Sequence, residues 1–207
     1  QEWGPHPDRG WNVVAWSLSM EWLAYLIFPL LVLVLFALHK RMPTAVLVLA
    51  WFVALTPLLW RGSLTLDPYY TDLWGSVIRV LTEFTAGAIT YLIVIRLIPS
   101  GATEPTPRIE RIATVVSMLM PIVVVAGAVF LGNWTTAQSP ITLTDPEAEP
   151  LPPFFHLWLV PPLIIWIGAL ALSRRGQARW FGTDAMILGG VVSYSLYMTH
   201  LVWFDVW

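Results

Sequence analysis

The sequence predicts an all-α fold, a polytopic membrane helix bundle. Of its 207 residues, 57% are hydrophobic and only 12% are charged, which is too apolar a composition for a soluble domain. Apolar segments recur along the chain, and most approach the ~20 residues that a helix needs to cross ~30 Å of hydrocarbon. They lie at about residues 14–38, 44–60, 77–98, 112–131, 155–173 and 186–205. We therefore expect about six transmembrane helices.

Helices are expected because lipid offers the backbone no hydrogen-bond partners, and because these segments are too long for the ~10-residue strands of a membrane barrel. The formal net charge of −2 argues against nucleic acid as a partner. The chain has no cysteine, so thiolate metal sites and thiol nucleophiles are excluded. The lipid bilayer is the first partner that the composition predicts.

The chain opens at Gln1 with a polar segment that has no initiating Met and no signal-peptide pattern. We expect residues 1–207 to be a single transmembrane domain that is an internal piece of a longer one. Residues 135–153 are rich in Pro, Thr and acidic residues, and this composition predicts an irregular loop rather than a domain linker.

The charges of the short loops predict an orientation. Basic residues favour the cytoplasmic side of a membrane, and they occur in alternate loops. They are Lys40 and Arg41, then Arg96, Arg108 and Arg111, then Arg174, Arg175 and Arg179. The intervening segments carry mainly Asp and Glu, so both ends of the chain are expected on the extracytoplasmic side.

The first apolar segment contains polar residues on one helical face. Ser17, Glu21 and Tyr25 are spaced i, i+4, i+8, so a helix places them in line. A charged group at mid-bilayer costs roughly 2.5–3.5 kcal/mol on insertion scales, and less towards the interface. We therefore expect Glu21 to face the interior of the bundle.

The third segment repeats this arrangement with Arg79, Glu83 and Gly87, where the glycine is expected to let another helix approach closely. Arg before Glu is the less favourable order for an i, i+4 ion pair. A contact between Glu21 and Arg79 across helices is therefore at least as plausible as the intrahelical pair. It would leave Glu83 near His200.

The last segment carries Ser193, Tyr194, Tyr197 and His200 after a Gly-Gly pair, and the first, third and fourth of these share one side of a helix. With a rise of ~1.5 Å per residue, Glu21, Glu83 and His200 lie at about 8 to 10 Å below the outer helix ends. They can therefore meet in one layer. The alternative is a purely structural network, in which His200 bonds a tyrosine or a backbone carbonyl.

Three blocks of this chain resemble the acyltransferase 3 family. The first is Trp16-Ser17-Leu18-Ser19-Met20-Glu21 with Tyr25 and Phe28-Pro29-Leu30-Leu31; the second is Arg79 with Glu83-Phe84 and Gly87; the third is Leu188-Gly189 with Ser193-Tyr194-Ser195-Leu196-Tyr197 and His200. The blocks occur in the family's order, and the resemblance covers the chain from about residue 14 to its end. It corresponds to the C-terminal portion of a bundle of about ten helices.

The resemblance implies a membrane-embedded O-acyltransferase. Such an enzyme moves an acyl group, expected to be acetyl, from a cytoplasmic donor such as acyl-CoA to a hydroxyl of an extracytoplasmic carbohydrate or lipid-linked acceptor. O-Acetylation of the cell envelope in a bacterial plasma (inner) membrane is the implied setting. The family's first helices, which carry a histidine thought to be catalytic, lie outside these residues and are implied as a partner. The chain alone is therefore expected to be inactive.

Acyl transfer to an alcohol needs a base near the acceptor hydroxyl and donors for the developing oxyanion. Glu21 and His200 are the candidate catalytic residues of this chain, although the upstream histidine is the better candidate for the principal base. The candidate substrate-binding residues are Ser17, Tyr25, Arg79, Glu83, Ser193, Tyr194 and Tyr197. No metal or bound cofactor is expected, because His and Cys pairs with ligand spacing are absent from the sequence.

Two other functions stay open. Intramembrane charge is typical of transporters, and Pro161-Pro162 is expected to kink or unwind the fifth helix, as in broken transporter helices. A noncatalytic membrane scaffold is the third possibility. Solute uptake without modification would favour transport, whereas a change of assembly without loss of chemistry on neutralising Glu21 would favour a scaffold.

Overall fold

The computed structural model describes residues 15–39, 41–64, 73–138 and 155–206, and these residues are helical apart from the short turns between helices. The elements are α1 (Ala15–His39), α2 (Thr44–Leu64), α3 (Leu73–Leu97), α4 (Pro107–Gln138), the 3-10 helix η1 (Phe155–Leu159), α5 (Val160–Leu172), α6 (Gln177–Phe181) and α7 (Asp184–Val206). A helix lies at each of the predicted apolar segments. The predicted all-α fold is confirmed, and no strand occurs within the described ranges.

The prolines of the fifth segment mark the start of a helix. Pro161 and Pro162 occupy the first turn of α5, where a missing backbone N–H removes no intrahelical bond. The turn that precedes them, η1, is a 3-10 helix. The two prolines therefore coincide with a change from 3-10 to α-helix at the entry to α5, rather than with a break in the middle of a helix.

Helix α4 is longer than its apolar segment. It runs through Gln138, so Thr135 and the residues after it up to Gln138 are helical rather than part of the predicted irregular loop. The sequence signal was weak here because polar residues without Gly or Pro can continue a helix that is already formed. The rest of the predicted loop, 139–154, lies outside the described residues.

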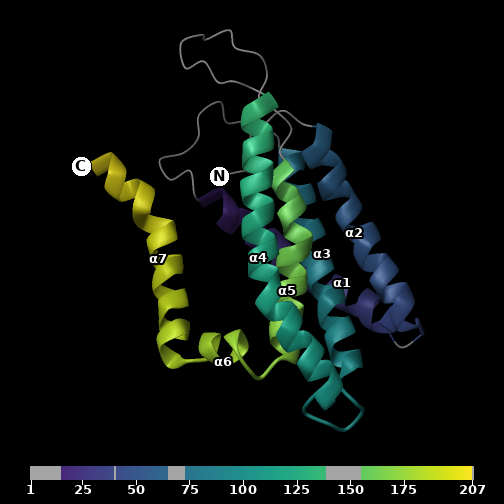
Figure 1. The fold of residues 1–207 in the computed structure, drawn as a ribbon. Coiled ribbons are helices and arrows are strands. Elements are labelled where there is room, and N and C mark those ends of the chain that lie inside the picture. The colour runs from purple at the N-terminus through teal and green to yellow at the C-terminus, as the bar shows by residue number, and fades with distance from the viewer. Residues whose placement is uncertain (1–14, 40, 65–72, 139–154, 207) are drawn as a thin grey trace.

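Helix α3 is at the centre of the packed region. It contacts α1, α2 and α5, while α4 packs on α5 and η1 (Figure 1). The apolar core lies where α1, α2 and α3 meet. Its buried members are Leu35, Leu47, Trp51, Leu55, Ala86, Ile89 and Leu92. Helix α3 therefore presents one face to this core and is free to present another to a different environment.

Helix α7 stands apart from the central helices at one side of Figure 1 and is joined to them through α6. The turn before α6 uses Gly176 at a φ of 57°, a left-handed conformation that suits glycine. Most described side chains of α7 are exposed, including Leu188, Val191 and Leu196. The helix thus borders an open space rather than a packed interface.

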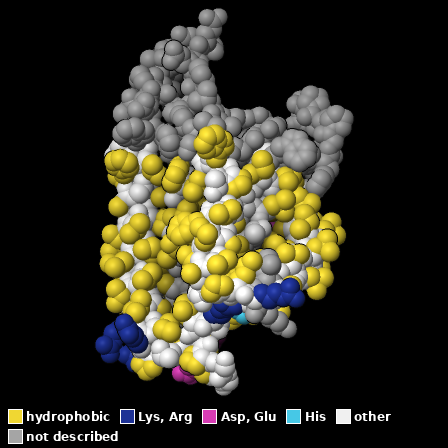
Figure 2. Space-filling view, turned by 90° about the vertical axis from the view of Figure 1, so that its right-hand side faces the viewer, with side chains coloured by type: hydrophobic (Ala, Val, Ile, Leu, Met, Phe, Trp, Pro, Cys, Tyr) yellow, Lys and Arg dark blue, Asp and Glu magenta, His cyan; other side chains and the backbone are white. Residues whose placement is uncertain are grey.

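The surface matches a membrane environment. Helices α1, α3 and α4 contain the long apolar stretches Leu18–Ala37, Val77–Leu97 and Pro107–Asn133, and two shorter apolar stretches are Thr44–Trp60 and Leu157–Leu172. Hydrophobic side chains cover most of the described surface in Figure 2, and Lys and Arg gather towards one end. That arginine-rich end comprises Arg41, Arg96, Arg108, Arg111, Arg174, Arg175 and Arg179. An integral membrane protein is the consistent interpretation.

Candidate functional site

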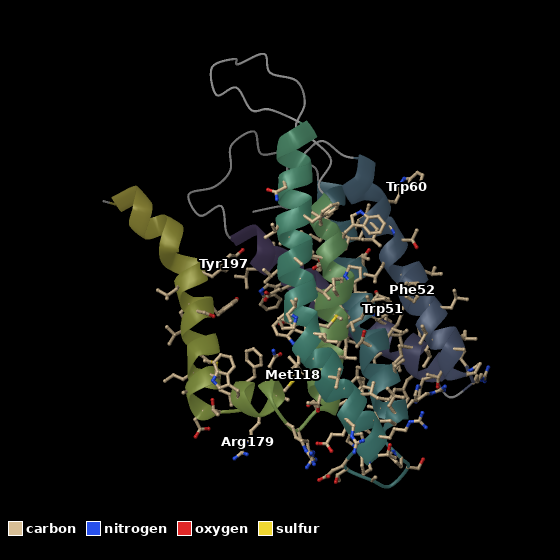
Figure 3. All side chains as sticks on the ribbon, in the orientation of Figure 1. Trp51, Phe52, Trp60, Met118, Arg179 and Tyr197 are labelled. Carbon is tan, nitrogen blue, oxygen red and sulfur yellow. The ribbon has the colours of Figure 1, made fainter. Side chains whose placement is uncertain are left out.

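A large cavity lies along the seam between α1 and α3, and Tyr197 of α7 contributes to its wall. Its volume is about 1000 Å³. We call it the seam pocket. Tyr197 extends from α7 towards the rest of the bundle (Figure 3). Residues from three helices that are far apart in the sequence therefore surround one space of the size that ligand sites usually have.

Helix α1 contributes a continuous stripe to the seam pocket. Glu21 and Tyr25 are followed by Phe28, Val32 and Phe36, all of which line the cavity. Their spacing of three or four residues keeps them on one face. From Glu21 to Phe36 the helix rises by about 22 Å, which is most of the thickness of the hydrocarbon core. The pocket is therefore a long trough with a polar end and an apolar end.

Helix α3 forms the facing wall with Arg79, Glu83, Gly87 and Tyr91, spaced four residues apart. Both helices begin at the end of the bundle opposite the arginine-rich end, so the charged residues of α1 and α3 lie at the same end of the trough. Gly87 was expected to allow a close helix contact. Among the described residues, an added Cβ at Gly87 would meet nothing within 4 Å, so none of their helices approaches it closely and the glycine lines open space in the pocket.

The charged end of the pocket contains an ion pair within α3. Arg79 Nε lies 3.1 Å from Glu83 Oε1 and donates a hydrogen bond to it. The side chains are 35% and 33% exposed, so the pair is only partly withdrawn from its surroundings. The intrahelical pair thus forms despite the less favourable order of its residues. Glu21 lines the same pocket but belongs to the other helix.

The predicted site residues fall into three groups. Those that line the seam pocket are Glu21, Tyr25, Arg79, Glu83 and Tyr197. Ser193 and Tyr194 lie on α7 outside the lining, and the Ser193 hydroxyl donates a hydrogen bond to the Gly190 carbonyl of its own helix at 3.0 Å. The side chains of Ser17 and His200 lie outside the described residues.

Sequence reasoning missed the apolar part of the pocket. Phe28 of α1 and Phe84 of α3 meet edge to face, with ring centroids 5.5 Å apart and an interplanar angle of 78°. Tyr91, which is 61% exposed, also lines the cavity. Extending the i, i+4 series from Gly87 by one more turn would have found Tyr91. The aromatic pair had no such signal, because apolar residues occur all around both helices.

This arrangement provides a carboxylate, a guanidinium paired with a second carboxylate, and phenol hydroxyls at one end of an apolar trough. A carboxylate can accept a proton from an alcohol, and guanidinium and phenol groups can donate hydrogen bonds to a developing oxyanion. Among the described residues, no three His, Asp or Glu side chains gather as a metal site would require. The chemistry available is that of acid–base and hydrogen-bonding groups.

Comparison with known proteins identifies a family. A family model described as an acyltransferase domain matches residues 2–207, nearly the whole chain. Neither the curated proteins nor the solved structures contain a significant match. The matched range includes the three sequence blocks and all the residues that line the seam pocket.

Proposed function

Because the chain belongs to the acyltransferase 3 family, we propose that the seam pocket is the acceptor-binding site of a membrane O-acyltransferase. The donor is a cytoplasmic acyl-CoA and the acceptor is a hydroxyl of an extracytoplasmic carbohydrate or lipid-linked sugar. The observation that carries the proposal is the convergence of Glu21, Arg79, Glu83 and Tyr197 from three helices on one cavity. Charged groups gathered inside a membrane bundle are typical of functional sites.

In the proposed reaction, the acceptor oxygen bonds to the thioester carbonyl carbon, and the carbon–sulfur bond then breaks to release the CoA thiol. Glu21 orients the acceptor hydroxyl and takes its proton, directly or through the histidine that the family resemblance implies, and this proton is then delivered to the departing sulfur. Arg79 and Tyr25 donate hydrogen bonds to the carbonyl oxygen as negative charge develops on it. Glu83 holds Arg79 in place through the 3.1 Å ion pair.

The proposal includes an orientation of the protein in the membrane. The arginine-rich end is cytoplasmic, by the preference of basic loops for that side. The charged end of the seam pocket then opens towards the extracytoplasmic side, where a carbohydrate of the cell envelope would reach it. A bacterial plasma membrane, with both ends of the chain extracytoplasmic, fits this arrangement. The experiments use the complete protein.

The test is Glu21→Gln in the complete protein, with acyl incorporation measured at matched amounts of folded enzyme. Loss of a base typically lowers the rate about 10² to 10⁴-fold, and we expect a loss of at least about 100-fold. The matched control is Glu104→Gln, because Glu104 pairs with Arg174 at the arginine-rich end, away from the pocket. Activity of Glu21→Gln within about twofold of the parent, where a base role requires about 10²-fold, would exclude Glu21 from the chemistry.

The transporter alternative loses one of its two supports. Pro161 and Pro162 lie in the first turn of α5, a position that prolines ordinarily occupy, and do not break a helix at mid-membrane. The same preparation in sealed vesicles separates the classes. An enzyme modifies the acceptor only when the acyl donor is supplied, whereas a transporter accumulates unmodified solute without the donor.

A further inference from the structure

The seam pocket has a second end, towards the arginine-rich end of the bundle, that the proposed acid–base chemistry does not use. The lining there comes from Phe36 of α1 and from Tyr91 and Leu92 of α3. About one turn further along α3 is Arg96, and about one turn further along α1 is His39, the last residue of that helix. Arg96 and His39 therefore lie just beyond the lining, where the trough reaches the arginine-rich end.

Arg96 joins the two walls of the pocket at this end. Its guanidinium Nη2 donates a hydrogen bond to the backbone carbonyl of His39, so the side chain crosses from α3 to α1. This carbonyl is one of the last of α1, which have no partner within the helix. The hydrogen bond therefore places the guanidinium at the seam, beside the last lining residues of the two helices, Phe36 and Leu92.

The charge of Arg96 has no counter-charge in the described part of the chain. No carboxylate there forms an ion pair with Arg96, and Glu104 and Glu110 pair with other arginines of this end. Burial, and secondly the Arg96 charge, lower the pKa of the His39 imidazole below its usual 6.5. Arg96 therefore acts on its neighbour as an uncompensated positive charge, which a bound anion would neutralise.

A phosphate is a stronger partner for the Arg96 guanidinium than the carbonyl that it now contacts. A carbonyl oxygen is neutral, whereas phosphate oxygens are charged and accept two parallel N–H groups from one guanidinium. The His39 carbonyl lies at the end of its helix, where water can replace the lost donor. Arg96 can therefore exchange this carbonyl for a phosphate by a change of rotamer, without leaving the seam.

We propose that Arg96 binds the diphosphate of the acyl-CoA donor at the arginine-rich end of the seam pocket. This role depends on the proposed function, which supplies the donor from that side. Arg96 follows Glu83 on α3 by a rise of about 20 Å, and the extended pantetheine arm of the donor bridges a separation of this kind. The arm lies along the trough, where the hydroxyl of Tyr91 is available to its amides. The thioester then lies near Arg79 and Tyr25.

The test compares two donors in the complete protein. Acetyl-CoA carries the diphosphate, whereas acetyl-pantetheine carries the same thioester without any phosphate. Arg96→Gln should raise the KM for acetyl-CoA about 10- to 100-fold, the loss expected when a hydrogen bond to a charged group is removed. The KM for acetyl-pantetheine should stay within about twofold of the parent value. If acetyl-pantetheine is too slow a donor, its inhibition constant against acetyl-CoA is compared instead.

Matched variants separate a donor contact from a general effect of charge. Arg179→Gln is the control, because Arg179 is exposed on α6, which packs on α4 and α5 and extends its arginine away from the bundle (Figure 3). It should leave both KM values unchanged. Arg96→Lys keeps the charge but loses the paired N–H groups, so it should restore the KM for acetyl-CoA only in part.

A purely structural role for Arg96 predicts a different result. Loss of the bond to the His39 carbonyl would then affect both donors equally, and equal changes in the two KM values would overturn the proposal. Equal effects of Arg96→Gln and Arg179→Gln on acetyl-CoA would also overturn it, because they would indicate general attraction to the arginine-rich end. If the parent protein modifies the acceptor with neither donor, the proposed function itself fails, and the role of Arg96 fails with it.

Discussion

One face of α3 lines the seam pocket, whereas an adjoining face packs into the apolar core. On the pocket face, Glu83 and Gly87 adjoin open space. On the core face, Ala86 and Ile89 are 0% and 3% exposed and contact α2. The charged residues of α3 therefore lie beside the cavity, and its small apolar residues lie where neighbouring helices pack closely. A charged group is costly in a membrane bundle except beside a partner or a cavity, so the division has an energetic cause.

Two glycines show the same contrast. A Cβ at Gly168 would lie 2.9 Å from the Thr90 methyl, whereas a Cβ at Gly87 would meet nothing within 4 Å. Gly168 is therefore required by the close packing of α5 on α3. The packing of the described residues does not require a glycine at position 87. Comparing substitutions at Gly168 and Gly87 therefore distinguishes an effect on stability from an effect on function.

The largest expected effect is that of Gly168→Leu. Thr90 cannot turn away easily, because its hydroxyl is bonded to Trp51 and to the Ala86 carbonyl. Overpacking of this kind typically costs 1–3 kcal/mol, and we expect about 3 kcal/mol of destabilisation in a thermal or SDS unfolding experiment. Gly87→Leu should leave unfolding within about 0.5 kcal/mol of the parent but reduce acyl transfer by narrowing the pocket. Equal destabilisation by both substitutions would erase the contrast between the two faces.

The next effect concerns the packed core of α2. Leu55 is 1% exposed and Phe52 is 59% exposed on the same helix. We expect Leu55→Ala to cost about 2 kcal/mol, the lower part of the range for cavity-forming substitutions, because the removed methyl groups gain little from transfer between lipid and protein. Phe52→Ala should cost less than about 0.5 kcal/mol. Unfolding experiments in detergent measure the loss of stability in both variants. A larger loss for Phe52→Ala than for Leu55→Ala would show that the core does not lie on the Leu55 side of α2.

A smaller effect is expected for the ion pair in the seam pocket. A double-mutant cycle of Arg79→Ala and Glu83→Ala should give a coupling free energy of about 0.5 to 1 kcal/mol, because both side chains are about one third exposed. Acyl transfer should fall more in Arg79→Ala than in Glu83→Ala if Arg79 contacts the oxyanion and Glu83 only positions it. The reverse order in catalytic rate would exchange these roles.

The smallest effect is a pH dependence at His39, at the arginine-rich end of α1. Burial, and secondly the nearby Arg96 guanidinium, lower the pKa of His39 below 6.5. The folded state therefore binds this proton less readily than the unfolded state, so the associated stability is full above pH 6.5 and decreases as the pH falls below it. Unfolding midpoints measured between pH 8 and pH 5 should show this decrease in the parent and a flatter profile in His39→Gln. An identical pH profile of stability in the parent and in His39→Gln would contradict the predicted contribution of His39.

The fold class and the site helices could be predicted because they follow from periodicity. Apolar stretches of membrane length gave the helices, and spacings of four residues gave the stripes that carry Glu21 and Arg79. Tyr197 was included on the same grounds and lines the pocket with them. The roles of these residues in catalysis stay predictions, as do those of Ser17 and His200, whose side chains lie outside the described residues.

Other features could not be read from the sequence. From the sequence, either Glu21 or Glu83 could form an ion pair with Arg79. The structure has the ion pair with Glu83, and the distance from Arg79 to Glu21 depends on where α1 lies relative to α3. Gly87 was expected in a helix contact because small residues are common there, but only the separation of the neighbouring helices decides what a glycine faces. The same applies to the apolar cavity among α2, α3, α4 and α5, whose lining comes from four helices and has no distinctive residue of its own.

The sequence by itself determined the membrane class, the helical fold, the face on which each polar residue lies and the membership of an acyltransferase family. Those properties depend on composition, on local periodicity and on motifs that are contiguous or nearly so. The tertiary structure alone decided which faces meet, that α3 separates a polar trough from an apolar core, and that an apolar cavity lies among α2, α3, α4 and α5. These properties depend on the distances between helices, which are set by side-chain volumes that far-separated segments contribute together.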